Sequence, residues 1–123
     1  MATDTKASVL SALRAFLASD GCLLLVVSAP AIYINEWASF STRDFPENHQ
    51  ACDGDRVRIV MLDVADHRPV EDVFCTDALY RRLFERAKLR VLDVQSPLAS
   101  GNEATLWTTE TRIAAWTIYV LAQ

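Results

Sequence analysis

The stretch Gly21-Cys22-Leu23-Leu24-Leu25-Val26-Val27-Ser28-Ala29-Pro30 decides how the rest of the chain is interpreted. It is apolar at successive positions, begins at a glycine and ends at a proline. Such a run is typical of a strand that is buried on both faces, in a parallel sheet flanked by helices. Ligands of open α/β sheets bind at the carboxyl ends of such strands. We therefore expect Ser28, Ala29, Pro30 and the residues after them to face a binding site.

Length and composition indicate one globular domain, residues 1–123. The chain is 51% apolar and 23% charged, as in ordinary folded proteins. Its net charge of −4, without a basic cluster, argues against a nucleic-acid surface. The apolar run at 21–30 is too short to span a bilayer, so we expect no membrane association.

Three cysteines without a CxxC motif favour a reducing, cytoplasmic setting over a disulfide framework. Cys22 and Cys75 lie in apolar strand patterns, and we expect both to be buried. The alternative is a signal peptide, with residues 22–27 as its apolar region. Asp4, Asp20 and the lack of basic residues next to the run argue against that alternative.

Periodicity predicts the remaining elements. A helix capped at Thr3-Asp4-Thr5 carries an apolar stripe and ends at Asp20-Gly21. Strands over 55–63 and 69–75 form an antiparallel hairpin. A second helix starts at Thr76-Asp77, and strands follow over 89–94 and 116–121. Between 31 and 54 we expect a loop with one helical turn around 35–40. The stripe of the first helix consists of Val9, Leu10, Leu13, Phe16 and Leu17.

Several kinds of chemistry are excluded by composition. The three glycines, Gly21, Gly54 and Gly101, are too far apart for a glycine-rich phosphate or dinucleotide loop. No GxSxG nucleophile motif occurs. His49 and Cys52 form one potential metal pair, but no second pair completes a zinc site, so we expect no metal.

Six segments stand out in the predicted order of elements: 21–30, Asn35-Glu36-Trp37, Val57-Arg58-Ile59-Val60-Met61-Leu62-Asp63, Arg68-Pro69-Val70-Glu71-Asp72, 76–84 and 107–121. Together they resemble the C-terminal half of a Rossmann-like (class I) S-adenosylmethionine-dependent methyltransferase, and the resemblance covers nearly the whole chain. The resemblance implies an α/β fold containing part of the family's sheet. In it, 21–30 is the fifth strand, 89–94 the sixth, and 116–121 an antiparallel seventh strand between them. Flanking helices and an added β-hairpin complete this partial sheet.

The same resemblance implies that the cofactor-binding half is absent. In that family a glycine-rich loop after the first strand and an acidic residue after the second hold S-adenosylmethionine. Nothing in this chain replaces them, so we assign no cofactor-binding residue and expect no cofactor bound to the chain alone. The sequence also departs from the family at Lys88, which stands where a glycine usually ends the helix. That position costs free energy if it is left-handed.

Eight residues are candidates for contacts with a methyl acceptor, and none of them is assigned a catalytic role. They are Tyr33, Glu36, Trp37, Glu71, Asp72, Trp107, Glu110 and Arg112. Tyr33, Glu36 and Trp37 follow the apolar run. They form either one wall of the acceptor site or ordinary loop packing. For Glu71 and Asp72, solvated or ion-paired hairpin carboxylates are the simpler interpretation. For the last three, a local Glu110–Arg112 pair that fixes the loop is the simpler account.

Two functional hypotheses remain. In the first, the chain supplies the acceptor side of a methyl-transfer site and is inactive until a partner provides the cofactor-binding half. In the second, it is a non-catalytic interaction or dimerisation module derived from a methyltransferase. The partner is an N-terminal methyltransferase half in the first case and a second copy of the chain in the second. Either partner would cover an open sheet edge beside residues 21–30.

Overall fold

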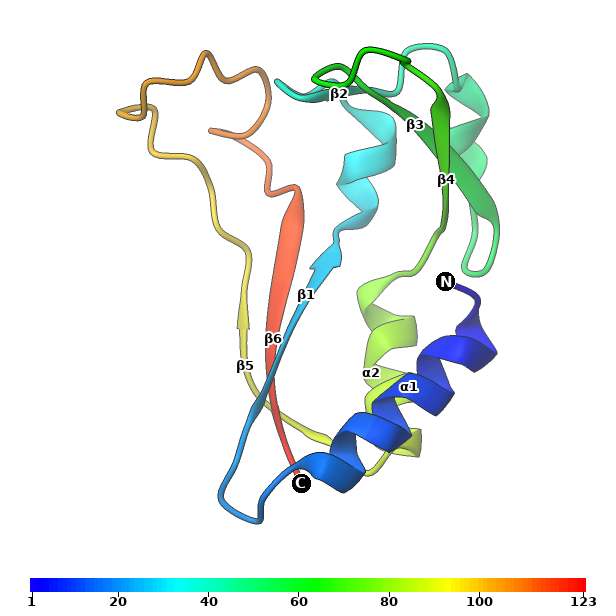
Figure 1. Ribbon diagram of the computed structural model, residues 1–123, viewed down its shortest axis with the longest axis vertical. Helices are drawn as coiled ribbons and strands as arrows, with labels where there is room; N and C mark the ends of the chain where they lie inside the picture. Colours follow the sequence, from blue (N-terminus) through cyan, green and yellow to red (C-terminus); the bar gives the residue numbers. More distant parts are fainter.

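Strands that are distant in sequence form the first sheet. The computed structural model describes residues 1–123 (Figure 1). Strands β1 (Leu23–Ser28), β6 (Trp116–Ala122) and β5 (Arg90–Gln95) lie in that order, and β6 is antiparallel to both neighbours. β1 and β5 are therefore parallel to each other. The predicted insertion of the last strand between two parallel strands is confirmed.

The second sheet is built on the predicted hairpin. Strands β3 (Arg56–Met61) and β4 (Pro69–Val73) pair antiparallel, and the short strand β2 (Phe40–Ser41) adds to the other edge of β3. The turn between β3 and β4 contains no glycine, and His67 adopts φ 47 there. The hairpin prediction is confirmed. The segment before it forms two 3-10 turns, η1 (Pro30–Ile34) and η2 (Pro46–Gln50), instead of the single turn expected around 35–40.

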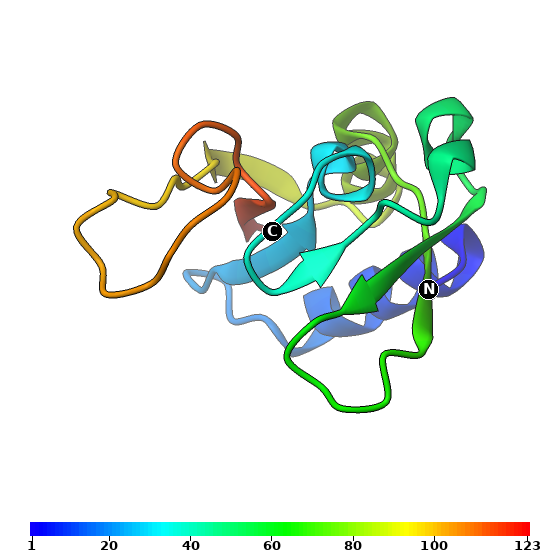
Figure 2. The ribbon, with the colours of Figure 1, turned by 90° about the horizontal axis from the view of Figure 1, so that it is seen from above.

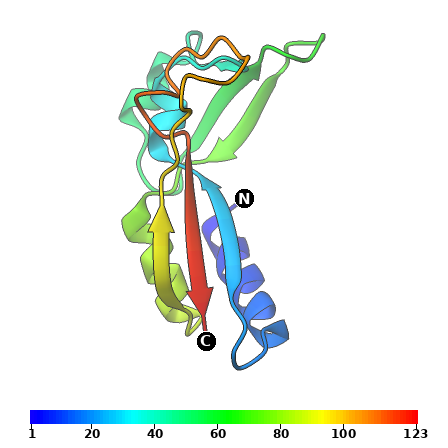
Figure 3. The same ribbon diagram turned by 90° about the vertical axis from the view of Figure 1, so that its left-hand side faces the viewer.

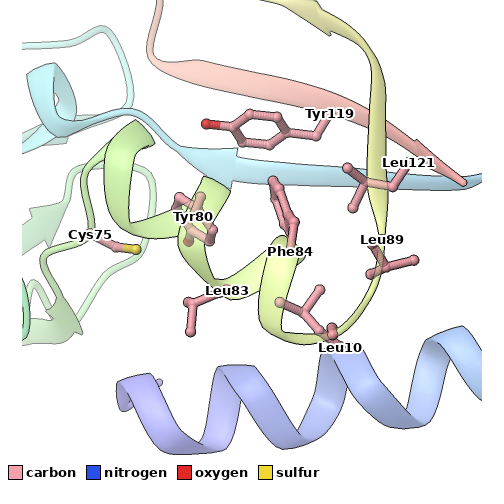
Figure 4. Packing of buried hydrophobic residues seen from close by; sticks show 9 residues of the cluster. Leu10, Cys75, Tyr80, Leu83, Phe84, Leu89, Tyr119 and Leu121 are labelled. Carbon is pink, nitrogen blue, oxygen red and sulfur yellow. The ribbon is translucent and has the colours of Figure 1, made fainter. Parts of the chain in front are cut away.

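Both α-helices cover the same face of the first sheet, as Figures 1 and 3 show. α1 (Thr3–Phe16) contributes Leu10 to the core, and α2 (Asp77–Arg86) contributes Leu83 and Phe84. In Figure 4 the Phe84 ring lies against Tyr119 of β6, with ring centroids 4.9 Å apart at an interplanar angle of 70°. This edge-to-face packing fixes α2 on the sheet.

The expectation that 21–30 is buried on both faces is wrong. Leu23, Leu25 and Val27 pack against the core, but Leu24 and Val26 are 64% and 61% exposed. The reason is that neither helix lies on the opposite face of the sheet. β1 is also an edge strand, because β6 is its only neighbour.

The first helix and one cysteine also differ from expectation. The amino-terminal residue of α1 is preceded by Ala2, and no side chain caps the helix. Phe16 is 89% exposed because the helix turns it away from the sheet. Cys22 is exposed, whereas Cys75 is buried as predicted. The predicted cap of α2 is confirmed, since the Thr76 side chain accepts a hydrogen bond from the Leu79 N–H.

A second, smaller core joins the second sheet to the segments above the first sheet. It contains Ile32, Tyr33, Trp37, Phe40, Val57 and Ala115. The long connection 96–115 lies beside η1 and β2 when the molecule is seen from above (Figure 2). Because this core forms at the carboxyl end of β1, it places hairpin residues next to that end.

Candidate functional site

An apolar cleft of about 260 Å³ lies between α1 and β1, the edge strand of the first sheet. Val9, Leu10 and Leu13 of α1 form one wall. Residues of β1 form the facing wall, and β4 and the start of α2 close the end. The remaining lining residues are Met1, Lys6, Leu25, Val26, Val27, Ser28, Tyr33, Asp72, Val73, Cys75 and Tyr80. The carboxyl end of β1 therefore faces a cleft, as expected for Ser28.

The chain direction after β1 brings Tyr33 into this cleft. Ala29 donates a backbone hydrogen bond to the Ala115 carbonyl oxygen, which holds the end of β1 beside β6. Pro30 then begins η1, where its fixed φ suits the first turn of a helix. One turn of η1 buries Tyr33 and leaves its side chain on the cleft wall.

A phenol–carboxylate pair forms the polar end of the cleft. The Tyr33 hydroxyl donates to Asp72 Oδ2 at 2.6 Å, and the Val73 N–H donates to Asp72 Oδ1 at 2.7 Å. The Met1 ammonium nitrogen lies 3.7 Å from the same Oδ1. Burial, followed by the hydrogen bond to Asp72, raises the pKa of Tyr33 well above its usual value. The phenol therefore stays protonated and keeps donating to the carboxylate.

Two further titratable groups that line the cleft, Cys75 and Tyr80, are neutral. Burial raises the pKa of the Cys75 thiol, so Cys75 is not an activated nucleophile. Burial also raises the pKa of the Tyr80 phenol, whose ring lies 5.6 Å from the Lys6 ammonium nitrogen. Asp72 is thus the one carboxylate among the lining residues, and Lys6 is the one basic side chain.

Of the eight candidate residues, the structure places only Tyr33 and Asp72 in the cleft. Trp37 is 2% exposed, and its indole Nε1 donates to the Ile32 carbonyl oxygen at 2.8 Å. Glu36 accepts hydrogen bonds from the Thr42 N–H and hydroxyl. Both residues therefore order the loop between η1 and β2. The side chain of Glu71 is exposed and pairs with Arg56 on β3 at 3.0 Å.

The predicted Glu110–Arg112 pair is absent. Glu110 Oε1 accepts from the Ala38 N–H at 2.6 Å, and Oε2 accepts from the Thr108 and Thr109 N–H groups, both at 2.9 Å. Backbone donors, not a guanidinium, therefore hold this carboxylate, and the Arg112 side chain is solvent-exposed. The Trp107 indole Nε1 donates to Glu103 at 3.1 Å, outside the cleft.

Sequence reasoning missed the wall that α1 contributes to the cleft, which includes Lys6, Val9 and Leu13. The apolar stripe of α1 was assigned wholly to the sheet, but only Leu10 of α1 is buried. Val9 and Leu13 remain 38% and 37% exposed and line the cleft. No local pattern distinguishes a stripe residue that lines a cleft from one that packs on the sheet.

Similarity to known proteins assigns no chemistry to the chain. No protein family, no curated protein and no solved structure matches the sequence or the fold. Neither α-helix has the length and apolar character required to cross a bilayer. Nowhere do three or more histidine, cysteine or acidic side chains come together as potential metal ligands. The features that bear on function are therefore the strand order of the first sheet and the cleft with its Tyr33–Asp72 pair.

Proposed function

We propose that this chain contributes the acceptor side of a S-adenosylmethionine-dependent methyl-transfer site, with the cofactor-binding half supplied from outside these 123 residues. The observation that carries the proposal is the order β1-β6-β5, with β6 antiparallel between two parallel strands. This is the order implied for strands five, seven and six by the resemblance to Rossmann-like methyltransferases.

The position of the cleft supports the same function. Ligands of open α/β sheets bind beyond the carboxyl ends of the strands, and Ser28 at the end of β1 lines the cleft. The outer edge of β1 is unpaired and carries no charged residue, so it is suited to pair with a strand of the cofactor-binding half. The acceptor then lies where the two halves meet. No general base is assigned.

The test has two steps. Isothermal titration of the purified chain with S-adenosylmethionine should give no binding heat. The tagged chain is then isolated from its native cells with its associated polypeptides and irradiated with methyl-labelled S-adenosylmethionine. The label should attach to the isolated assembly in the wild type but not in the Val26→Lys variant. Leu92→Lys is the matched control, because Leu92 is also an exposed apolar strand residue but lies on β5 at the opposite edge.

Two outcomes would contradict the proposal. Tight binding of S-adenosylmethionine by the chain alone would mean that the cofactor site is not supplied from elsewhere. An isolated assembly that takes up no label would mean that no cofactor-binding half covers β1. The three free cysteines suit a reducing compartment, so we place this assembly in the cytoplasm.

The second candidate is a non-catalytic dimerisation module. It is favoured by the exposed apolar face of the first sheet, where Leu24, Val26 and Trp116 are 64%, 61% and 45% exposed. Two copies paired through β1 would form one continuous sheet and cover the open β1 edge of each copy. Sedimentation velocity should then show a dimer that the Val26→Lys variant cannot form. A wild-type chain that stays monomeric at all concentrations would exclude this candidate.

A further inference from the structure

We propose that the cleft between α1 and β1 binds a small apolar amine, with the ligand's ammonium group at Asp72 and its hydrocarbon body between Leu10, Leu13 and Leu25. This inference rests on the proposed function, because it names the class of methyl acceptor. Its test uses the chain alone and no cofactor, so the two proposals can fail separately.

The charge of the polar end selects a cation. Asp72 is the one carboxylate that lines the cleft, and Tyr33 donates to its Oδ2 at 2.6 Å. A neutral phenol on one oxygen orients the carboxylate without neutralising it. The other oxygen, Oδ1, accepts from the Val73 N–H and already has the Met1 ammonium nitrogen at 3.7 Å. That contact is long, and both side chains are about half exposed, so a bound ammonium group can replace it.

An anionic ligand is disfavoured by the same geometry. A carboxylate or phosphate at this end would lie against Asp72, and repulsion between like charges opposes that placement. Lys6 is the one basic side chain of the wall, and its ammonium nitrogen lies over the Tyr80 ring at 5.6 Å from the centroid. Its charge is thus engaged by an aromatic face.

The rest of the cleft sets the size and polarity of the ligand. Eleven of the fourteen lining residues are hydrophobic, and the volume is about 260 Å³. This is below the ~300 Å³ at which sites for drug-sized ligands begin, so a small molecule fits best. Val9 and Leu13 are partly exposed in the free chain, and contact with a hydrocarbon body would remove their apolar surface from water.

Calorimetric titration with three probes of one shape tests the inference: phenethylamine, phenethyl alcohol and hydrocinnamate. The amine should bind the purified chain about tenfold or more tightly than the alcohol, as expected for a charge-assisted hydrogen bond, and the carboxylate should bind most weakly. Asp72→Asn should remove the preference for the amine, so that amine and alcohol bind with similar affinity. Glu71→Gln is the matched control, because the neighbouring Glu71 pairs with Arg56 and does not line the cleft.

A second variant places the binding in the cleft even if Asp72→Asn does not fold. Val9→Trp fills the space between α1 and β1 and should abolish binding of both the amine and the alcohol. Equal affinities for amine and alcohol, no binding of either, or an equal loss in Glu71→Gln would overturn the inference. In those cases labelling of the assembly by the cofactor would still report separately on the proposed methyl transfer.

Discussion

Lys88 shows how a single residue ends α2 at a cost. Its φ of 57 is left-handed, as expected from the missing glycine at this position. The Lys88 N–H bonds to the Glu85 carbonyl oxygen, and the Leu89 N–H bonds to that of Phe84. These two hydrogen bonds define a Schellman motif, which satisfies the last carbonyl groups of the helix. A lysine Cβ is strained in this conformation, whereas glycine is not.

Lys88→Gly should therefore stabilise the protein. We expect the free energy of unfolding to rise by about 0.5–1 kcal/mol, because strain relief exceeds the added entropy of the unfolded chain. Urea denaturation monitored by circular dichroism measures the change. Lys88→Ala is the control, since it keeps the Cβ and should leave stability unchanged. A glycine variant no more stable than the alanine variant would show that this position is unstrained.

Tyr119 couples the stability of the core to pH. Its hydroxyl donates to Asp77 Oδ1 at the start of α2, and this hydrogen bond, with one from Arg81, lowers the pKa of Asp77. A carboxyl group whose pKa is lower in the folded than in the unfolded protein stabilises the fold at pH values above its unfolded-state pKa. That contribution is lost as the pH falls through the folded pKa.

Tyr119→Phe should lower the free energy of unfolding at neutral pH by about 1 kcal/mol and move acid unfolding to higher pH. Acid titration followed by circular dichroism measures both effects. In an Asp77→Asn background the same change should no longer shift the acid midpoint, because the titrating carboxyl is gone. A shift that persists in that background would assign the pH dependence to another group.

At the scale of elements, β1 was identified correctly as a strand but wrongly as fully buried. Apolar residues at successive positions predict burial on both faces only if both faces are covered. Here α1 and α2 share one face of a three-stranded sheet, so Leu24 and Val26 face solvent. An exposed apolar face of this kind is typical of a surface that another chain covers.

The same substitution at two valines separates the covered and uncovered strand faces. Val26 is 61% exposed and Val57 is 1% exposed. Val26→Thr should change the free energy of unfolding by less than about 0.5 kcal/mol, as is usual for surface positions. Val57→Thr should cost about 1–3 kcal/mol, because it buries a hydroxyl in an apolar core. Thermal unfolding of both variants measures the two losses of stability. Equal losses would mean that the outer face of β1 is covered by other residues of the same chain.

At the scale of the whole molecule, Glu110 joins segments that are far apart in sequence. Its carboxylate accepts backbone hydrogen bonds from Ala38, Thr108 and Thr109, and the Thr109 hydroxyl donates to the Glu36 carbonyl oxygen. Burial alone would raise the pKa of Glu110, but the backbone hydrogen bonds outweigh it and lower that pKa. Contacts of this kind hold the connection 96–115 against the second core.

Glu110→Ala should release the connection 96–115 without unfolding the two sheets. We expect faster cleavage by a protease within 96–115 and a loss of stability of about 1–2 kcal/mol, from backbone donors left without a partner. Limited proteolysis with mass spectrometry locates the cleavage. Arg112→Ala is the control and should behave like the wild type, because Arg112 forms no ion pair. If the protease cleaves Glu110→Ala as slowly as Arg112→Ala, Glu110 does not hold the connection 96–115 in place.

The sequence by itself determined the two helices, the hairpin and the cap at Thr76, because periodicity, turn residues and capping act over short distances. The insertion of the last strand was expected from the resemblance to Rossmann-like methyltransferases, since strand order depends on pairing between distant segments. The sequence also indicated that the end of β1 faces a site, from the direction of a single strand. Only the tertiary structure decided which faces are covered, that Asp72 of the hairpin meets Tyr33, and that Glu110 bonds to Ala38 instead of Arg112. The physical reason is that burial and hydrogen-bond partners depend on where separate segments pack, and no local pattern in the chain encodes that placement.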